Sequence, residues 1–571
     1  MENENGLLVE SPIWSIARNC RILQNVRVPM RDGVRLSTTI YLPLQDSPCP
    51  AVLVRTPYNR IGFYDPYFTA HGMALVVQDC RGRYDSEGEF YPFIYEANDS
   101  FDTLAWLAAQ PWCNGRIGMF GDSYLAAVQF AAALSDSPHL TALNPRFMTA
   151  DGWKRGYYCD GAFSLGLTWS WLCFEMAART SQAAIMPLFD VARLLRRLPI
   201  ARLDELSGAG VVSAYRDYVN HSFYDEHWAG LSLRDKYHHF KVPVLLTGGW
   251  YDYYPSQAVT TFLNLRKYAP TPELRDSHRL ILGPWTHGIN QGSVLGELDF
   301  GEQATAENLA THRWLDCLLH GKSPAEFQAA PIRLFVMGAN QWRDEYEWPL
   351  ARTRYVKYYL RCNGRLTLQP PRDEPPDRYT YDPEDPVPTV GGNHSIGPYN
   401  PGLYELARPG PYDQRQIEAR PDVLIFTSDP LEKDTEVTGP VLVHLYASSS
   451  ARDTDFVARL TDVYPDGRSI NITEGILRAR FREDVWGQPS LLEPHRVYHF
   501  TIDLQVTSNV FKRGHRLRLQ ITSSGFPLWD RNLNTGGDPA TDTELQIAEQ
   551  TVYHDSTHPS HLLLPIIPPE G

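Results

Sequence analysis

The stretch Arg116-Ile-Gly-Met-Phe-Gly-Asp-Ser-Tyr-Leu-Ala-Ala-Val-Gln-Phe130 decides the fold that we expect for this chain. Residues 117–120 are short and apolar, as in a buried strand, and the residues from Tyr124 onward have helical length and an alanine-rich face. The Gly-Asp-Ser sequence between them predicts a sharp corner. The stretch therefore indicates strand, turn and helix, with Ser123 at the corner.

A serine at such a corner is typical of a nucleophile elbow, in which a strained turn exposes the hydroxyl and the next backbone amide faces the oxygen under attack. Gly121 suits this turn because a side chain there would collide with the approaching helix. The usual pattern is Gly-x-Ser-x-Gly, but Leu125 occupies the second glycine position. The alternative is that Ser123 only caps the helix, since serine is a favoured N-cap residue.

Size and composition indicate a soluble protein of several domains. A chain of 571 residues exceeds what one hydrophobic core usually organises, so we expect two or three domains. Its net charge of −14 disfavours a nucleic-acid partner, because phosphates would be repelled. No run approaches eighteen apolar residues, and the first residues lack the regions of a secretory signal. We therefore expect a cytoplasmic protein without a membrane partner.

The spacing of the eight cysteines matches neither a disulfide framework nor a metal site. They are scattered without a Cys-x-x-Cys pair, which argues against disulfides and against a zinc site. Fourteen Trp and 31 Tyr residues supply large rings for a pocket as well as for a core. We expect neither a metal ion nor an organic cofactor.

Apolar strands alternate with helices over much of the first 350 residues. Residues 23–41 predict an antiparallel hairpin, 50–54 and 73–79 predict buried strands, and 96–109 has helical spacing. The strand pattern resumes at 242–252, 278–287 and 331–338, with a helix over 304–319 between the last two. This alternation is typical of an α/β fold with a mostly parallel sheet, in which functional groups gather at the carboxyl ends of the strands.

Two other segments depart from this pattern. Between residues 151 and 236, aromatic-rich helical segments such as 163–178 and 191–198 predict a helical cap. After residue 350 come proline-rich loops and then runs that alternate as the strands of a sandwich do, with no strong helix. We therefore divide the chain into a discontinuous α/β domain (1–150 and 237–350), a cap (151–236) and an all-β domain (351–571).

A serine nucleophile needs a base and an orienting carboxylate, because its hydroxyl is protonated at neutral pH. On α/β-hydrolase folds these residues follow in the order Ser, Asp, His, each on a loop after a strand. Asp252 ends the first strand after the cap, and His287 lies in the loop that ends the next one. Taken singly, Asp252 could be a helix cap and His287 an ordinary core or surface residue. Together they favour a triad with Ser123.

The oxyanion that forms on attack needs at least two hydrogen-bond donors. The elbow supplies the backbone N–H of Tyr124. We expect a second donor from the loop after the strand over 50–54, where Tyr58 offers a hydroxyl in place of the glycine-rich backbone typical of lipases. Tyrosine is abundant in this chain, so Tyr58 alone is weak evidence.

Five motifs, taken in order, resemble those of the cocaine esterase-like hydrolases. They are R-T-P-Y (55–58), Q-D-C-R-G-R-Y-D-S-E-G-E-F (78–90), G-R-I-G-M-F-G-D-S-Y-L (115–125), G-G-W-Y-D (248–252) and G-P-W-T-H-G (283–288). The family also takes in X-Pro dipeptidyl peptidases, α-amino acid ester hydrolases and glutaryl-cephalosporin acylases. The resemblance covers essentially the whole chain, and Leu125 is a normal residue in the elbow of this family.

The resemblance implies a site and an architecture. By matching position it implies Ser123 as nucleophile, Asp252 and His287 as its triad partners, and the Tyr58 hydroxyl with the Tyr124 amide as oxyanion hole. It also implies an α/β-hydrolase core, a helical cap, a C-terminal jelly-roll domain, and a homodimer or higher homo-oligomer. The activity that it implies is hydrolysis of a carboxylic ester or activated amide through an acyl-enzyme.

The substrate stays open at this point. Aromatic cap residues are candidates to line a pocket for an aryl or alkyl acyl group: Trp153, Tyr157, Phe163, Trp169 and Trp171. The alternatives are X-Pro dipeptidyl-peptidase, α-amino acid ester hydrolase and β-lactam side-chain acylase activity. Peptidase or amino-ester activity would require cap carboxylates to hold an ammonium group, and the cap offers Asp160, Glu175, Asp225 and Glu226. An alternative of another class is a non-catalytic binding protein that uses the all-β domain.

Overall fold

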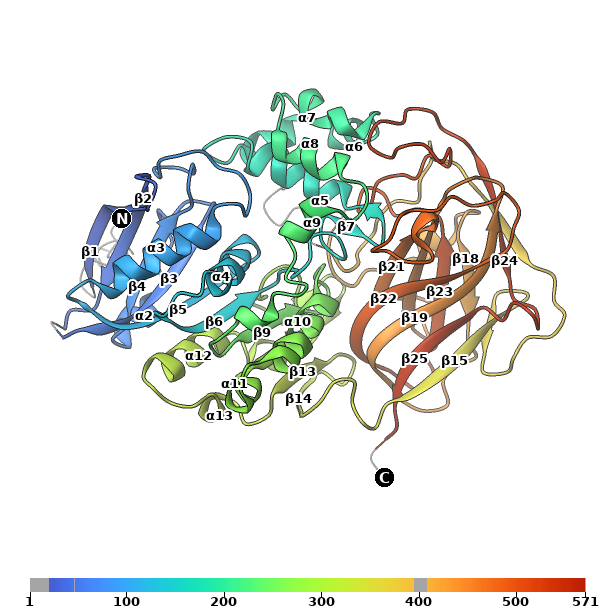
Figure 1. The fold of residues 1–571 in the computed structure, drawn as a ribbon. Helices are drawn as coiled ribbons and strands as arrows, with labels where there is room; N and C mark the ends of the chain where they lie inside the picture. Colours follow the sequence, from blue (N-terminus) through green and yellow to red (C-terminus); the bar gives the residue numbers. More distant parts are fainter. Residues whose placement is uncertain (1–19, 46, 395–407, 570–571) are drawn as a thin grey trace, which may run out of the picture.

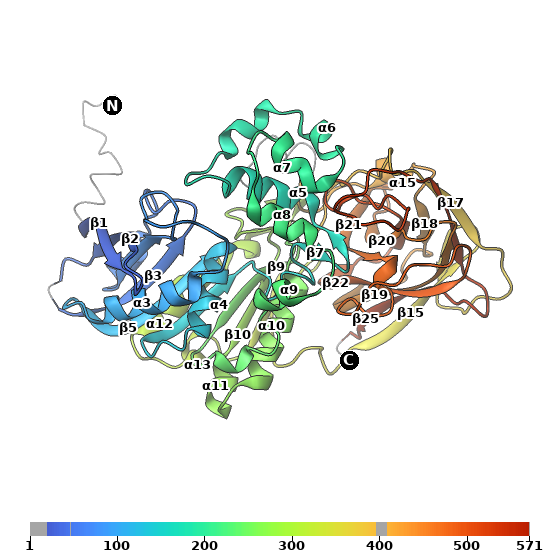
Figure 2. The same cartoon turned by 45° about the horizontal axis from the view of Figure 1, so that its top comes forward.

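The computed structural model of the chain describes residues 20–45, 47–394 and 408–569 (Figure 1). Figure 1 shows the α/β domain at the left, the short cap helices at the top, and the C-terminal β domain at the right. The first 19 residues that we assign to the α/β domain, and residues 395–407 of the all-β domain, lie outside the described residues. Figure 2 shows the cap above the junction between the two larger parts.

A ten-stranded sheet forms the first part, in the order β1-β2-β4-β3-β5-β6-β9-β10-β13-β14. The pairs from β4 through β13 are parallel, whereas β1, β2 and β14 join the edges in antiparallel pairs. Every residue of β3, β4, β9 and β10 is buried, as expected for strands in the interior of a parallel sheet. The strands are β1 (Arg21–Pro29), β2 (Arg35–Leu42), β3 (Cys49–Thr56), β4 (Ala74–Asp79), β5 (Cys113–Asp122), β6 (Leu140–Arg146), β9 (Leu245–Gly249), β10 (Arg279–Gly283), β13 (Ile332–Val336) and β14 (Gln341–Glu345).

The helices of this part connect and cover the strands. Helix α4 packs on β5 and β6 and against α3, while α12 packs on the same two strands and against α2. The predicted hairpin at 23–41 is confirmed as β1 and β2, and the predicted helix at 96–109 is confirmed as α3. The helices are α2 (Pro66–Ala70), α3 (Glu96–Ala108), α4 (Tyr124–Leu134), α10 (Pro255–Tyr268), α11 (Pro272–Ser277), α12 (Ala310–Leu319) and α13 (Pro324–Phe327).

Two details of this part differ from the prediction. The helix expected over 304–319 begins only at Ala310, after a separate 3₁₀ turn at Glu302–Thr305. A strand that we did not predict, β14, folds back on β13 after a turn in which Gly338 and Asn340 adopt positive φ. This hairpin ends the sheet on an antiparallel edge. A small ribbon, β11 (Val294–Leu295) with β12 (Leu298–Asp299), precedes that 3₁₀ turn.

The cap consists of short helices and one small hairpin. The helix that we predict over 163–178 is wrong as a single element, because Phe163 pairs with Tyr158 in the hairpin and the helix then changes to a π-helical turn at Trp171–Glu175. Such turns are rare and often occur at functional sites. The elements are β7 (Tyr158–Cys159), β8 (Ala162–Phe163), α5 (Leu165–Ser170), α6 (Val191–Leu195), α7 (Leu203–Leu206), α8 (Ser213–Asn220) and α9 (Glu226–Gly230), with 3₁₀ turns at Ala183–Leu188 and Ile200–Arg202. A 3₁₀ turn at Tyr237–His239 then leads back into the α/β domain.

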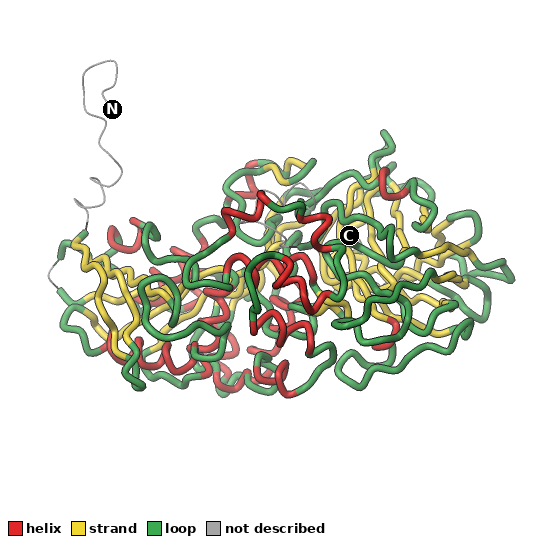
Figure 3. Tube along the Cα trace, turned by 90° about the horizontal axis from the view of Figure 1, so that it is seen from above, coloured by secondary structure: helices red, strands yellow, loops and turns green. Residues whose placement is uncertain are grey.

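The C-terminal part is the predicted all-β jelly-roll domain. Among its described residues, eleven paired strands enclose their own apolar core, with the helical turn α15 (Arg415–Glu418) and a 3₁₀ turn at Ala479–Phe481 beside them. Figure 3 shows how strands dominate this end of the molecule while helices gather elsewhere. The strands are β15 (Arg354–Arg361), β16 (Arg365–Thr367), β17 (Asp377–Tyr381), β18 (Leu424–Thr427), β19 (Thr435–Ser449), β20 (Asp455–Val463), β21 (Ser469–Arg478), β22 (Tyr498–Phe511), β23 (Arg516–Thr522), β24 (Ala548–Tyr553) and β25 (His561–Ile567).

Candidate active site

Ser123 lies at the corner between β5 and α4 with φ 58° and ψ −122°. A non-glycine residue at positive φ is strained, and strain of this kind collects at functional sites. Its side chain makes no capping hydrogen bond to the described residues of α4, so the alternative that Ser123 only caps this helix has no support. The backbone N–H of Ser123 instead donates to the carbonyl of Arg146 at the end of β6 (3.0 Å).

The glycine before the corner is needed for space. A Cβ atom on Gly121 would lie 2.4 Å from the Cβ of Leu125, and Gly121 has φ +148°. The collision that we predict from the sequence is therefore with the residue that occupies the second glycine position of the elbow pattern. Since Leu125 fills this space, only glycine at 121 lets the helix approach the strand.

Asp252 and His287 meet because they follow neighbouring parallel strands, β9 and β10. The Nδ1 atom of His287 lies 2.8 Å from Oδ1 of Asp252, and both side chains are buried. Burial raises the pKa of Asp252, while the charge and hydrogen bond of His287 oppose this shift. Tyr254, not Asp252, is the N-cap residue of α10, so the alternative reading of Asp252 as a helix cap has no support.

Ser123 and His287 line the same small cavity, which has a volume of about 30 Å³. The other side chains around it are mostly apolar or aromatic, and none of the nine described residues that line it is acidic. Burial raises the pKa of the Tyr157 and Tyr254 hydroxyls, which keeps them neutral. The nine residues are Phe93, Ser123, Tyr124, Met148, Tyr157, Leu167, Trp171, Tyr254 and His287.

Tyr58 lies on the loop after β3, and its hydroxyl accepts a hydrogen bond from the indole N–H of Trp171 (3.1 Å). An indole N–H can only donate, so the proton of the Tyr58 hydroxyl must point away from Trp171. Trp171 is itself a lining residue of the cavity that holds Ser123. The cap thus orients the phenol that the resemblance assigns to the oxyanion hole.

The Tyr124 side chain is anchored in a buried charged network behind the elbow. Its hydroxyl donates to Oε1 of Glu96 (2.8 Å) and accepts from the backbone N–H of Phe93 (3.0 Å). Glu96 also pairs with Arg55 at 2.7 Å, and both side chains are almost fully buried. Arg55 lies three residues before Tyr58, so this network connects the two segments that carry the expected oxyanion donors.

The predicted pocket residues divide into two groups. Tyr157 and Trp171 line the cavity beside Ser123. Trp153, Phe163 and Trp169 do not line it and belong to the apolar core of the cap. Trp153 donates to the carbonyl of Val485 (2.7 Å), and Trp169 packs against Phe174 with ring centroids 5.0 Å apart.

Four residues that line the cavity were not predicted from the sequence. Tyr254 lies two positions after Asp252, so the strand-end argument could have found it. Phe93, Met148 and Leu167 sit in irregular segments or a short helix, where spacing gives no direction to a side chain.

The four cap carboxylates do not line the cavity. Asp160 is buried and paired with Arg155 at 2.9 Å, and Asp225 caps α9 and contacts His221. Glu175 is buried, which raises its pKa. Glu226 is in the first turn of α9.

Asp122 is beside Ser123 in the sequence, but its carboxylate pairs with Arg146 at the end of β6.

Two other kinds of site are absent from the described residues. No group of three or more His, Cys, Asp or Glu side chains in the described part is arranged to hold a metal ion. None of the helices within residues 20–45, 47–394 and 408–569 has both the length and the apolar character that spanning a membrane requires.

Comparison with known proteins places this geometry in a family. Residues 32–289 match the X-Pro dipeptidyl-peptidase (S15) family, and residues 326–563 match the C-terminal non-catalytic domain of X-Pro dipeptidyl-peptidases. The cocaine esterase of Rhodococcus sp. (strain MB1 Bresler) is 38% identical over 96% of this chain and 99% of its own.

Two solved structures are similar over 99% of both chains. An α-amino acid ester hydrolase has a TM-score of 0.86 at 27% identity, and an aminopeptidase from a marine sediment Thaumarchaeota archaeon has 0.83 at 26% identity. Both extend over the α/β, cap and β parts together. Because a relative is 38% identical over nearly the whole of both chains, the chain belongs to the cocaine esterase-like (CocE/NonD) family of serine hydrolases and acts on ester bonds.

Proposed function

We propose that Ser123, His287 and Asp252 form a catalytic triad that hydrolyses carboxylic esters with an uncharged, apolar acyl group. The observation that carries this proposal is one cavity that holds both Ser123, in its strained elbow, and His287, hydrogen-bonded to buried Asp252. The largely apolar lining, without an acidic side chain among its nine described residues, supports an ester whose acyl part has no ammonium group.

The reaction proceeds in two acyl transfers. His287 takes the proton of Ser123 as its oxygen attacks the ester carbonyl, and Asp252 stabilises the imidazolium that forms. The Tyr58 hydroxyl and the Tyr124 amide donate hydrogen bonds to the oxyanion. His287 then protonates the departing alcohol, which leaves an acyl group on Ser123. Water attacks this acyl-enzyme by the same route and releases the carboxylic acid.

A fluorophosphonate probe and a simple ester test this proposal together. The wild-type chain should be labelled on Ser123 and should hydrolyse p-nitrophenyl acetate, whereas Ser123→Ala should lose both. Ser135→Ala is the matched control, because Ser135 lies at the other end of α4 and its hydroxyl donates to the carbonyl of Ala132 (2.7 Å), away from the site. A Ser123→Ala enzyme that still turns over the ester would exclude the triad, and an unreactive wild type would favour a binding protein.

Amino-ester or X-Pro peptidase activity is the second candidate function. The family match and the α-amino acid ester hydrolase among similar structures favour it. The absence of acidic side chains from the nine described lining residues disfavours it. Matched esters with and without a free α-amino group separate the two: we expect the free amine to lower kcat/KM.

A cytoplasmic location and a homo-oligomeric state stay predictions of this proposal. Size-exclusion chromatography with light scattering would test the second, and a monomer of 64.9 kDa would contradict it.

A further inference from the structure

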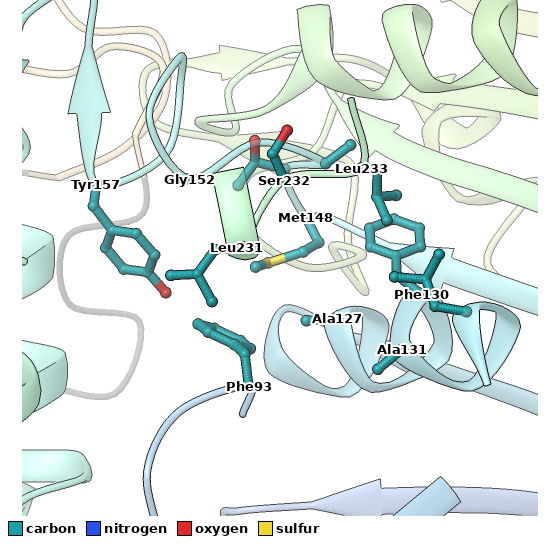
Figure 4. Close-up of a pocket in the computed structure, with 14 residues that line it drawn as sticks. Phe93, Ala127, Phe130, Ala131, Met148, Gly152, Tyr157, Leu231, Ser232 and Leu233 are labelled. Atoms are coloured by element: carbon teal, nitrogen blue, oxygen red, sulfur yellow. The ribbon is translucent and has the colours of Figure 1, made fainter. Parts of the chain in front are cut away.

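A second, apolar cavity adjoins the one that holds Ser123, on the side of helix α4 (Figure 4). Its volume is about 100 Å³, against about 30 Å³ for the catalytic cavity. Phe93, Met148 and Tyr157 line both cavities, so the two cavities meet at these three side chains, which we call the wall. The space beyond this wall is unused by the mechanism above.

One face of α4 leads from the nucleophile into this cavity. Ala127, Phe130, Ala131 and Leu134 line it, and they follow Ser123 at the spacing of residues that share a helix face. Two of the four are alanines, whose small side chains leave the space open. Figure 4 shows Met148 and Leu231 pointing toward Ala127 and Phe93 across the hollow. The elbow helix therefore directs the cavity away from Ser123 along its own axis.

Thr149 and Ser232 line this cavity, but the hydrogen atoms of their hydroxyl groups are already donated within the protein. The hydroxyl of Thr149 donates to the carbonyl of Asp151 (2.6 Å), and that of Ser232 donates to Oδ2 of Asp151 (2.6 Å). Most of the remaining described lining residues are aliphatic or aromatic. An apolar occupant is thus favoured, because a polar group would lose its hydrogen bonds to water without replacement.

The wall itself is held by the elbow. Phe93 has φ 69°, a strained value for a bulky residue, and its backbone N–H donates to the hydroxyl of Tyr124 (3.0 Å). Its ring also stacks on Tyr124, with centroids 4.7 Å apart and planes 20° apart. Tyr124, the residue that follows the nucleophile, therefore holds Phe93 in place, while Met148 and Tyr157 border the same junction between the two cavities.

We propose that the cavity along α4 binds the apolar chain of the substrate's acyl group, so that the enzyme prefers linear aliphatic acyl groups longer than acetyl. This inference rests on the proposed function and names its substrate class. The acyl side is favoured because His287 and Tyr254 line the catalytic cavity but not this one. The departing alcohol must stay beside His287, which protonates it, so the acyl chain extends to the opposite side. A cavity of about 150 Å³ can hold benzene, and one of about 100 Å³ suits a chain of a few carbons.

The test compares p-nitrophenyl acetate, butanoate, hexanoate and octanoate. Burial of each methylene should raise kcat/KM about fourfold until the cavity is full. Ala131→Leu places three more carbons in the cavity; displacing three methylenes of the acyl chain should lower the hexanoate-to-acetate ratio of kcat/KM about sixtyfold. Ala108→Leu, a half-buried alanine at the end of α3, is the matched control and should leave this ratio unchanged.

A second variant shifts the preference in the opposite direction. Met148→Ala removes part of the wall and should raise the octanoate-to-acetate ratio, which general damage to the enzyme would not do. Acetate esters of longer alcohols serve as the comparison series, with hydrolysis measured by proton release. In this series Ala131→Leu should not change the dependence of kcat/KM on chain length. Equal loss for all acyl chains, no change in either variant, or a shift in the alcohol series would overturn the proposal. Labelling of Ser123 and acetate turnover report on the proposed function separately.

Discussion

Asp252→Asn should nearly abolish turnover while it leaves the shape of the site intact. In the wild type, Oδ1 of Asp252 accepts from Nδ1 of His287 at 2.8 Å, which places the remaining lone pair of the imidazole on Nε2. An asparagine amide can donate to Nδ1 instead, and His287 would then carry its proton on Nε2. That tautomer cannot accept the proton of Ser123.

The size of the effect follows from burial. Asp252 is fully buried, so no water replaces the lost carboxylate when His287 becomes positively charged. The same change in a serine protease triad lowers kcat about 10⁴-fold, and we expect a loss of this order, about 5.5 kcal/mol in the barrier. KM should change little, because Asp252 is not among the residues that line the cavity.

The assay is kcat and KM for p-nitrophenyl acetate, with a thermal melt to show that the variant folds. Asp122→Asn is the matched control: this carboxylate is next to Ser123 in the sequence but pairs with Arg146 at a half-exposed site. It should keep activity within about threefold, since such pairs contribute little. An Asp252→Asn variant that retains more than a tenth of the wild-type kcat, or an Asp122→Asn variant that loses as much activity, would contradict this role of Asp252.

Three further outcomes are expected. Tyr58→Phe should lower kcat by about 10² to 10³ without changing the melting temperature; an unchanged rate would remove Tyr58 from the oxyanion hole. Glu96→Gln should lower the free energy of unfolding by about 3 kcal/mol, because buried Arg55 loses the nearer of its two carboxylate partners and keeps only Asp99 at 3.6 Å; denaturant titration would contradict this if the midpoint stayed the same. Burial lowers the pKa of His278 to about 3, so the protein should lose roughly 4 to 5 kcal/mol of stability as pH falls from about 6.5 toward 3, where the unfolded chain binds the extra proton. His278→Gln should flatten that part of the stability profile, and an equally steep variant would show that other groups cause it.

The sequence predicts the Asp252–His287 contact well because strand order and chain order combine at that point. Both residues follow buried strands, and β9 and β10 are direct neighbours in the parallel sheet. Parallel neighbours end on the same edge, so side chains just beyond them meet regardless of what the cap does. The strain at Ser123 was predictable for a similar reason, since the strand, the turn and the helix are all local in sequence.

The pocket was less predictable because the cap has no long-range regularity. Trp153, Phe163 and Trp169 are of the residue types that line pockets, yet all three are buried in the same apolar cluster. Trp153, for example, packs against the rings of Trp228 and Phe481. Whether an aromatic side chain in a short helix or a turn points inward depends on contacts with distant segments. Composition and spacing in the sequence do not determine the direction in which such a side chain points.

A buried arginine explains how the cap can position a group in the α/β domain. The guanidinium of Arg83 is fully buried and donates to the carbonyls of Pro57 (2.9 Å) and Glu175 (2.7 Å). Pro57 precedes Tyr58, and Glu175 ends the π-helical turn that begins at Trp171. Burial of this charge is costly unless its acceptors stay in place, so the Tyr58 loop and the turn are held at a fixed separation.

The bond from Trp171 to Tyr58 then orients the phenol across that separation. The two expected oxyanion donors therefore depend on two buried arginines: Arg83 holds the Tyr58 loop against the cap, and Arg55, through Glu96, holds Tyr124 against the elbow. Each donor must lie within a few tenths of an ångström of its working position for a hydrogen bond of about 3 Å to the oxyanion. The buried guanidinium groups of Arg83 and Arg55 keep these segments in position, because moving their hydrogen-bond acceptors away would leave a buried charge without partners.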